Sequence, residues 1–260
     1  MKQSKEIVDG RRKRIMEIIK KTGDARVPDI AAHLGVSEIT VRRDLQYLED
    51  HRQIDRYYGG ARVRQDRQVR VRDEISVCRE QIARYAASLV EDGDTIFINT
   101  SSTALQAVQY ITARDVTVIT NNGNIVTSSK NPSHITIILL GGELRNIKGT
   151  MVGEFALHNL AHVTATRAFI GCTGLSLENG MMTQFLNEVD INKNMVLRTS
   201  GTAYILADHT KLGKDSSFVS FGMDLITDVI TDSRADPAVM DELKERGVGV
   251  HVAPESSRRG

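Results

Sequence analysis

Short β-branched apolar runs alternate with longer helical segments over the last two thirds of the chain. Seven such runs are predicted to be strands, at residues 95–99, 116–120, 135–140, 168–170, 203–207, 225–231 and 248–252. Continuously apolar runs of this length are typical of parallel strands buried on both faces, and most intervening segments are long enough for crossover helices. With further helices predicted at 76–90 and 237–246, the pattern predicts an α/β domain with a mostly parallel sheet.

The first 50 residues follow a different pattern, that of three short amphipathic helices. These helices are predicted at residues 11–21, 27–33 and 38–50. Pro28 suits the first turn of the second helix, where its missing N–H costs little, and Gly35 ends that helix. Ser37 is a good N-cap for the third helix. The spacing is that of a helix-turn-helix.

A hairpin is predicted directly after the third helix. Residues 53–57 and 61–64 form its strands, and the glycines of Tyr58-Gly59-Gly60 can supply the positive φ angles of a tight turn. The first 64 residues therefore predict a winged helix-turn-helix domain. The polar, arginine-rich residues 65–75 show little periodicity and are predicted to be a linker, so residues 76–260 form the second domain.

Charge is divided unevenly between the two ends, although the formal net charge is only +1. Through Arg72 there are 18 Lys and Arg against 11 Asp and Glu, a balance of +7, and the rest of the chain balances at −6. A basic end suits a polyanion such as DNA. No apolar run approaches the roughly 18 residues of a membrane span, and the N-terminus lacks a signal-peptide pattern, so we expect a cytoplasmic protein with no membrane partner.

The two cysteines carry no recognisable chemical motif. Cys78 and Cys172 have neither metal-ligand spacing nor the density of a disulfide framework. We expect both to be small buried thiols. The sequence predicts no metal site, no cofactor and no catalytic residue.

The third helix is expected to bury Val41, Leu45 and Leu48 and to present a polar, basic face to DNA. The residues predicted to contact DNA, on this helix and on the hairpin, are Ser37, Glu38, Thr40, Arg42, Arg43, Gln46, Arg56, Tyr57, Tyr58 and Arg62. Guanidinium groups neutralise phosphate, and a bidentate arginine can read guanine. The tyrosines can instead pack over the domain's own core. A protein-interaction module with a solvated basic face is the alternative, but it would require neither the charge balance nor the turn spacing.

The residues from Val36 to Glu49 (VSEITVRRDLQYLE), followed by Arg56 to Ala61 (RYYGGA), resemble the signature of the DeoR-type repressors of sugar metabolism. The resemblance implies that the first stretch is the recognition helix and the second the wing. Asp44 is expected to orient a neighbouring arginine, since phosphates repel a carboxylate.

The resemblance extends to the rest of the chain and implies a sensor domain similar in fold to ribose-5-phosphate isomerase. Loops matching that domain begin at the carboxyl ends of the predicted strands, where ligands bind in open α/β sheets. They are expected to converge on one effector cleft formed by Asn99, Thr100, Ser101, Ser102, Thr103, Asn121, Asn122, Gly141, Gly142, Gly171, Asp208 and Lys211. Residues 100–103 suit a phosphate, although a simple helix cap is the alternative.

Two positions depart from the family pattern. Asn99 and Ser101 stand where the family usually has an acidic residue and a glycine, so the effector or its pose can differ from the common one. Glu188 and Lys193 lie on a helix predicted to begin near Phe185. They can approach the cleft, but we expect them to form an ordinary solvated face.

Together these features predict a DNA-binding repressor of a carbohydrate-metabolism operon, controlled by a phosphorylated sugar or related metabolite. Because one winged helix offers little contact area and operators are often two-fold, we expect a homo-oligomer. The rival hypothesis is a working sugar-phosphate isomerase fused to a DNA-binding domain. That reaction needs a positioned base and stabilisation of an enediolate, and no residues could be assigned to those roles.

Overall fold

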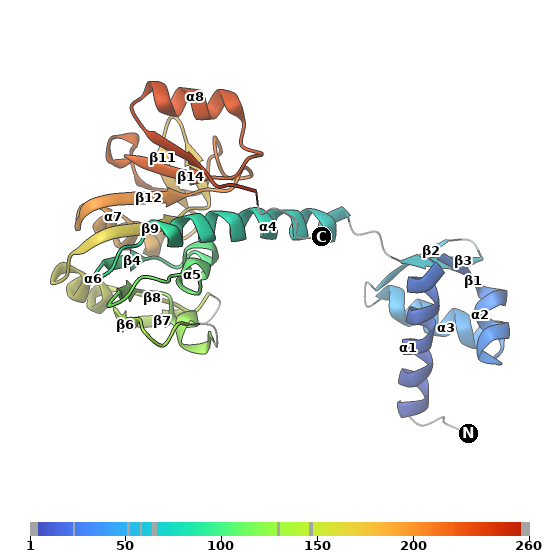
Figure 1. Ribbon diagram of the computed structural model, residues 1–260. Coiled ribbons are helices and arrows are strands. Elements are labelled where there is room, and N and C mark those ends of the chain that lie inside the picture. Colours follow the sequence, from blue (N-terminus) through green and yellow to red (C-terminus); the bar gives the residue numbers. More distant parts are fainter. Residues whose placement is uncertain are drawn as a thin grey trace. The chain divides into compact units, whose positions relative to one another are not determined.

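The computed structural model describes residues 5–22, 24–50, 53–57, 59–63, 67–128, 131–145 and 148–255. The chain divides into two compact units, Met1–Asp73 and Glu74–Gly260 (Figure 1). Within the described residues, every helix is too short or too polar to cross a membrane.

The N-terminal unit is a three-helix domain with a small antiparallel sheet. Its elements are α1 (Lys5–Thr22), β1 (Asp24–Arg26), α2 (Val27–Leu34), α3 (Glu38–Asp50), β2 (Ile54–Tyr57) and β3 (Gly60–Val63). Ile15, Ile30 and Leu45, one from each helix, are fully buried in a common core. The three predicted helices and the hairpin are confirmed. Strand β1, which pairs with β3 in the order β1-β3-β2, was not predicted because three residues show no periodicity.

The predicted helix signals act as expected. Gly35 has a left-handed φ of 64° at the end of α2, and the Ser37 hydroxyl accepts a hydrogen bond from the Thr40 backbone N–H at 3.3 Å. Of the two described glycines in the hairpin turn, Gly59 has a positive φ of 89° and Gly60 does not, so the prediction for Gly60 was wrong. Gly60 is instead required by close approach, since an added Cβ would overlap the Tyr57 side chain and lie 2.8 Å from the Ala25 carbonyl oxygen.

The predicted linker is helical where the structure describes it. Helix α4 runs from Arg67 to Ser88 and crosses the boundary between the two units, whereas a helix was predicted only from residue 76. Residues 67–75 contain neither glycine nor proline and are rich in arginine, a good helix former, so they extend the helix whose later turns are buried. Without an apolar face, the extension left no periodic signal.

A seven-stranded parallel sheet forms the centre of the C-terminal unit, in the order β15-β14-β12-β9-β4-β5-β6. Its strands are β4 (Thr95–Ile98), β5 (Thr117–Thr120), β6 (Thr136–Leu139), β9 (Ala165–Gly171), β12 (Thr199–Leu206), β14 (Asp228–Thr231) and β15 (Gly249–Val252). All seven predicted strands are confirmed. The strand predicted from residue 225 begins only at Asp228, because Met223–Leu225 forms a 3-10 turn.

Helices cover both faces of this sheet. Helices α4 and α5 (Ser102–Val108) pack on one face, in the core cluster that includes Ile82 and Val108. Helices α6 (Glu154–Ala161), α7 (Val189–Leu197) and α8 (Pro237–Glu245) pack on the other, in the cluster that includes Leu160 and Leu243. In β4, Phe97 packs in the cluster with α6, α7 and α8, whereas its neighbours pack in the cluster with α4 and α5. Successive side chains of a strand point to opposite faces of the sheet, which explains this alternation.

Two small antiparallel sheets follow the ends of the parallel strands, and neither was predicted. One pairs β7 (Glu143–Arg145) with β8 (Thr150–Val152), and the other orders β10 (Gly174–Ser176), β11 (Gly180–Thr183) and β13 (Phe218–Phe221) as β10-β11-β13. Their sequences, ELR, TMV, GLS, GMMT and FVSF, lack the β-branched apolar runs by which the parallel strands were predicted. These sheets and the 3-10 turn η2 (Leu186–Glu188) supply part of the site described below.

Candidate functional sites

The outer face of α3 is polar and exposed, as predicted. Ser37, Glu38, Arg42, Arg43 and Gln46 are exposed and Thr40 is partly so. Val41, Leu45 and Leu48 on the opposite face are buried in the core of the unit. The helix therefore offers a mainly polar surface, interrupted by the exposed Ile39, to an approaching molecule.

Several of these side chains are held by neighbours. The Arg42 guanidinium lies 3.2 Å from the Glu38 carboxylate one turn earlier. Arg56 of the hairpin hydrogen-bonds the Gln46 side chain and lies 3.6 Å from Glu49, which joins the hairpin to α3. Arg43 is exposed and forms no ion pair within the part of the chain that the structure describes. Of the helix arginines it is the one that DNA can engage without breaking a pair.

Asp44 orients arginines, as expected, but they lie on α1. Its buried carboxylate is 2.5 Å from Arg11 Nε and 3.1 Å from Arg12 Nε. The Arg12 guanidinium also stacks 3.5 Å from the centroid of the Tyr47 ring. Asp44 thus holds α3 against α1 and keeps two basic groups in place.

The hairpin residues are described in part. The Tyr57 hydroxyl donates a hydrogen bond to Asp24 at 3.2 Å, so this side chain is engaged within its own domain. Arg62 is exposed, and its backbone pairs with Asp24 on one side and Asp55 on the other. Tyr58 lies outside the described residues.

A pocket of about 290 Å³ lies where β4, β5 and β9 end in the C-terminal unit. Its lining is mainly polar and comprises Thr100, Ser101, Ser102, Leu105, Asn122, Asn124, Lys148, Gly171, Cys172, Thr173, Thr183, Glu188 and Lys211. Six of the twelve predicted effector residues line it, namely Thr100, Ser101, Ser102, Asn122, Gly171 and Lys211. The predicted convergence of the strand-end loops on one cleft is therefore seen for half of the set.

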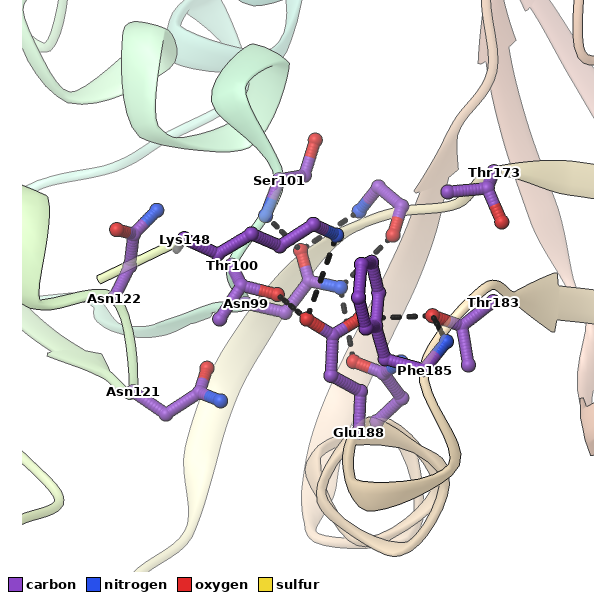
Figure 2. Close-up of polar contacts among 12 residues, drawn as sticks. Asn99, Thr100, Ser101, Asn121, Asn122, Lys148, Thr173, Thr183, Phe185 and Glu188 are labelled. Carbon is purple, nitrogen blue, oxygen red and sulfur yellow. Dashed lines mark hydrogen bonds and ion pairs between the residues drawn. The ribbon is translucent and has the colours of Figure 1, made fainter. Parts of the chain in front are cut away.

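Glu188 is the centre of a buried polar network in this pocket (Figure 2). Its carboxylate accepts hydrogen bonds from the hydroxyls of Thr100 at 2.9 Å and Thr183 at 2.8 Å, and it lies 3.6 Å from Lys148 Nζ. The same ammonium sits 3.9 Å from the centroid of the Phe185 ring. A carboxylate with only 5% of its residue exposed is thereby compensated by a cation and two hydroxyls.

The expectation of a solvated face was wrong for Glu188, while Lys193 is exposed. Glu188 belongs to the 3-10 turn η2, and α7 begins only at Val189, so extrapolating a helical period backwards from α7 misplaces it. Lys148 was not predicted, because it lies between two short strands that the sequence does not reveal. Thr173 and Thr183 lie in stretches that carry the family resemblance but were not selected.

Asn99 supports the pocket from behind instead of lining it. Its side-chain oxygen accepts from the Gly171 N–H at 3.0 Å and the Ser101 N–H at 3.2 Å, and its amide donates to the Gly171 carbonyl at 2.8 Å and to Asn192 at 2.9 Å. The hydrogen bonds of the Asn99 side chain therefore join the ends of β4 and β9 to α7. Gly171 is required because an added Cβ would overlap Ser101.

The other predicted effector residues have structural contacts and do not line the pocket. Thr103 is buried within α5, and Asn121 donates to the Met151 carbonyl at 3.2 Å. Gly141 and Gly142 have φ values of 72° and 100°, in the turn that precedes β7. These residues shape the loops behind the pocket. A pattern of polar residues after strands cannot distinguish such residues from those that line the pocket.

Asp208 lies beside the pocket and links two cations. Its carboxylate is 2.8 Å from Arg79 Nε of α4 and 3.8 Å from Nζ of Lys211, and it also accepts a hydrogen bond from Thr210. Burial raises the pKa of Asp208, but the hydrogen bonds from Thr210 and Arg79 and the charges of Lys211 and Arg79 outweigh it and lower the pKa overall. Asp208 is therefore ionised, and it connects a lysine of the pocket to α4.

A helix-turn-helix followed by an α/β unit with a polar pocket defines a regulator of the ligand-sensing type. Matches to known families agree, since the DeoR-like helix-turn-helix domain matches residues 11–67 and the DeoR C terminal sensor domain matches residues 76–233. The chain belongs to the DeoR family.

Three relatives are similar to the chain over most of its length. The uncharacterized HTH-type transcriptional regulator YulB of Bacillus subtilis (strain 168) is 30% identical over 258 residues, which cover 97% of this chain and 99% of the relative. The lactose phosphotransferase system repressor of Staphylococcus aureus (strain N315) is 33% identical and covers 84% of this chain and 89% of its own. The B. subtilis regulator IolR is 26% identical, with 91% and 96% covered.

Similarity to solved structures is lower. Ribose 5-phosphate isomerase A of Methanocaldococcus jannaschii matches 51% of this chain and 52% of its own with 16% identity and a TM-score of 0.36. The beta subunit of eIF2B from Chaetomium thermophilum matches 61% and 49%, with 16% identity and a TM-score of 0.43. The isomerase implied by the resemblance is thus among the matches, but similarity at this level carries no argument about function.

Proposed function

We propose that this protein is a transcription repressor of a carbohydrate-metabolism operon, and that a phosphorylated sugar or related metabolite in the C-terminal pocket controls its affinity for operator DNA. The observation that carries the proposal is the pocket, in which Lys148, Lys211 and several hydroxyls meet a buried carboxylate. The relatives that are named as repressors and regulators support the same class of function.

The N-terminal unit supplies the DNA grip. Arg42 and Arg43 project from the exposed face of α3, and Arg56 is fastened beside them by Gln46. Arginines in this arrangement can neutralise backbone phosphates or read guanine in the major groove. The chain's balance of +7 through Arg72 would strengthen this binding and make it sensitive to salt.

The pocket's chemistry suits a ligand with an anionic end and a hydroxylated end. The ammonium groups of Lys148 and Lys211 and the hydroxyls of residues 100–102 would hold a phosphate. Glu188 is an acceptor for sugar hydroxyls, and a phosphate would have to keep its distance from that carboxylate. A volume of about 290 Å³ suits a small metabolite.

Communication between the sites is proposed to run through Asp208 and α4. Lys211 reaches both the pocket and Asp208, and Asp208 pairs with Arg79 on the helix that continues to Arg67. A ligand anion that competes for Lys211 would change the charge balance at Asp208 and hence the contact with α4. Ligand and DNA would then each weaken the binding of the other, as linkage requires.

The isomerase hypothesis is less well supported. Among the described residues that line the pocket, Glu188 is the only carboxylate, and it already accepts two hydroxyl hydrogen bonds and faces Lys148. An isomerisation needs a positioned base and stabilisation of an enediolate, and these described residues offer no second carboxylate to share those roles. We therefore propose that the protein is not an enzyme. Turnover of any phosphopentose or phosphohexose well above background would overturn this.

A thermal-shift screen tests the proposed ligand class. The purified chain is heated with a panel of phosphorylated sugars, the matching unphosphorylated sugars and inorganic phosphate. A selective ligand raises the apparent melting temperature because it binds the folded state only. We expect phosphorylated members to stabilise and their unphosphorylated partners to have little effect. We also propose a homo-oligomer acting in the cytoplasm, and light scattering during size exclusion measures the oligomeric state.

A further inference from the structure

Outside the pocket, three side chains with metal-ligand chemistry meet at the carboxyl edge of the sheet. Cys78 lies on α4, His209 follows β12, and Asp232 directly follows β14. The Sγ, Nδ1 and carboxylate oxygen of these residues all lie within 4.8 Å of one another. Cys78 and Asp232 are buried, whereas the His209 side chain retains 22% exposure and provides a route from solvent.

The donor set fits one kind of ion. A thiolate, an imidazole and a carboxylate together favour a borderline transition metal such as Zn²⁺ over the oxygen-preferring Mg²⁺ and Ca²⁺. In a tetrahedral zinc site, bonds of about 2.0–2.3 Å place neighbouring ligand atoms roughly 3.3–3.8 Å apart. The present separations bracket that range, because His209 Nδ1 lies 2.9 Å from Asp232 and no pair exceeds 4.8 Å.

Asp232 is already oriented by groups that a metal would leave intact. Its carboxylate accepts hydrogen bonds from the backbone N–H of His209 at 2.8 Å and of Arg234 at 3.0 Å. Supporting hydrogen bonds of this kind accompany carboxylates that bind metals. Coordination would replace the contacts that the Asp232 carboxylate makes with His209 Nδ1 and with the Cys78 thiol.

We propose that Cys78, His209 and Asp232 form a binding site for Zn²⁺ or a similar divalent transition metal, with water completing the coordination. On binding, the Cys78 thiol releases its proton to solvent. His209 stays neutral, with its proton on Nε2 instead of Nδ1, and Asp232 binds as the carboxylate. One proton is therefore released for each metal bound, and no other reactant is needed.

The site would join α4 to the ends of two neighbouring strands. Cys78 is adjacent to Arg79, and His209 is adjacent to Asp208, so the metal would reinforce the same attachment that the Arg79–Asp208 pair makes. The metal would therefore stabilise the folded C-terminal unit. The sequence did not reveal the site because its ligands are separated by 131 and 23 residues.

Another histidine–aspartate pair offers a matched control. His251 Nε2 lies 2.8 Å from Asp228, much as His209 lies from Asp232, and the only described group of three metal-ligating residues does not include it. A His251→Gln variant removes an imidazole from an equivalent pair without touching the proposed ligands. Cys172→Ser likewise removes the other cysteine.

The test titrates the metal-free full-length chain with Co²⁺, whose absorption reports thiolate coordination, and then with Zn²⁺ in competition with a chelator. We expect one metal per chain in the wild type, H251Q and C172S, with a thiolate-to-metal absorption band. C78S and H209Q should bind at least about 100-fold more weakly, since loss of even a supporting group costs 10–100-fold. Circular dichroism of each metal-free variant establishes folding.

Three results would overturn the proposal: no stoichiometric binding by the wild type, an unchanged Co²⁺ spectrum in C78S, or equal weakening in H251Q and H209Q. If C78S does not fold, H209Q decides the matter, since its imidazole is partly exposed. A second readout is melting temperature, which Zn²⁺ should raise in the wild type but not in H209Q. None of these measurements uses DNA or a sugar, so failure here is distinct from failure of the proposed repressor function.

Discussion

The guanidinium of Arg79 lies 2.8 Å from the carboxylate of Asp208, and the same carboxylate lies 3.8 Å from a lysine that lines the pocket. Asp208 is 2% exposed, and the hydrogen bonds from Thr210 together with these two cations compensate it for leaving water. Helix α4 carries Arg79 and also extends into the unit that contains the helix-turn-helix. This pair is therefore where a change in the pocket can reach the connecting helix.

Replacement of this arginine should separate ligand binding from its effect on DNA. In Arg79→Gln, the ligand found by the thermal-shift screen should still bind, while its effect on operator affinity should shrink towards none. Stability should fall by roughly 1–3 kcal/mol, less than for a fully buried pair, because Arg79 is a third exposed and Lys211 still faces Asp208.

The control for this variant is Arg84→Gln, which removes an exposed pair with Glu80 on the same helix. An exposed pair is worth only about 0.3–0.5 kcal/mol, and the contact of Arg84 with the Tyr110 ring about 0.5–1 kcal/mol, so the ligand response should stay near wild type while stability falls by about 1 kcal/mol. Retention of the full ligand response in Arg79→Gln would rule out the proposed route through Asp208.

Removal of the charge of Glu188 should strengthen anion binding. In Glu188→Gln, Lys148 loses the carboxylate 3.6 Å away, and the pocket becomes more positive by one charge. Affinity for inorganic phosphate, measured by calorimetry, should rise, while affinity for the intact ligand should fall if its hydroxyls use the carboxylate. Asp190→Asn, on the exposed side of α7, changes the net charge equally and should leave both affinities unchanged. Weaker phosphate binding in Glu188→Gln would contradict the assignment of Lys148 as an anion ligand.

Gly171 and Ser101 should show strong coupling. Gly171→Ala should destabilise the protein by about 1–3 kcal/mol, because the new Cβ overlaps the Ser101 side chain. Ser101→Gly removes the obstructing atoms, so the double variant should recover most of that loss, apart from a few tenths of a kcal/mol for the cap of α5. Urea unfolding of the four proteins measures the coupling. Equal effects of Gly171→Ala in both backgrounds would show that the overlap is relieved elsewhere.

The two α3 arginines should differ in how they bind DNA. Replacing either one with alanine should cost roughly 1–3 kcal/mol of operator affinity if it reads a base, or reduce the salt slope by about 1 if it holds a phosphate. We expect the larger loss for Arg43, since Arg42 is paired with Glu38. Arg246→Ala, at the C-cap of α8 in the other unit, is the control. Operator binding unchanged in both α3 variants would refute the helix assignment.

The sequence was most informative where a periodic pattern was long enough to read. The three N-terminal helices and the seven parallel strands each bury a continuous or regularly spaced apolar set, and all were predicted. The strands flanking residues 146–149 and the sheet that contains Thr183 lack such a set, because glycine, polar or charged residues interrupt their apolar side chains. Lys148 and Thr183 were therefore missed with the elements that hold them.

Residue type and loop position did not show which residues line the pocket and which support its loops from behind. Asn99 and Thr100 are neighbours at the end of β4. The Asn99 amide makes all its hydrogen bonds behind the pocket, whereas the Thr100 side chain lines the pocket and contacts Glu188. The difference depends on partners from β9, η2 and α7 that lie 72 to 93 residues away in sequence. Separation in sequence likewise conceals the cluster of Cys78, His209 and Asp232.

We propose that this chain binds a specific DNA sequence and that a phosphorylated sugar changes its affinity for that DNA. The direct measurement is fluorescence anisotropy of an operator fragment, selected from random-sequence DNA, titrated at fixed salt with and without each member of the phosphosugar panel. We expect at least one phosphosugar to change the Kd for the operator by about 5–150-fold, which is the usual range of allosteric coupling. Its unphosphorylated partner should have no effect. Sequence-independent DNA binding, or an operator affinity that no phosphosugar alters, would contradict it.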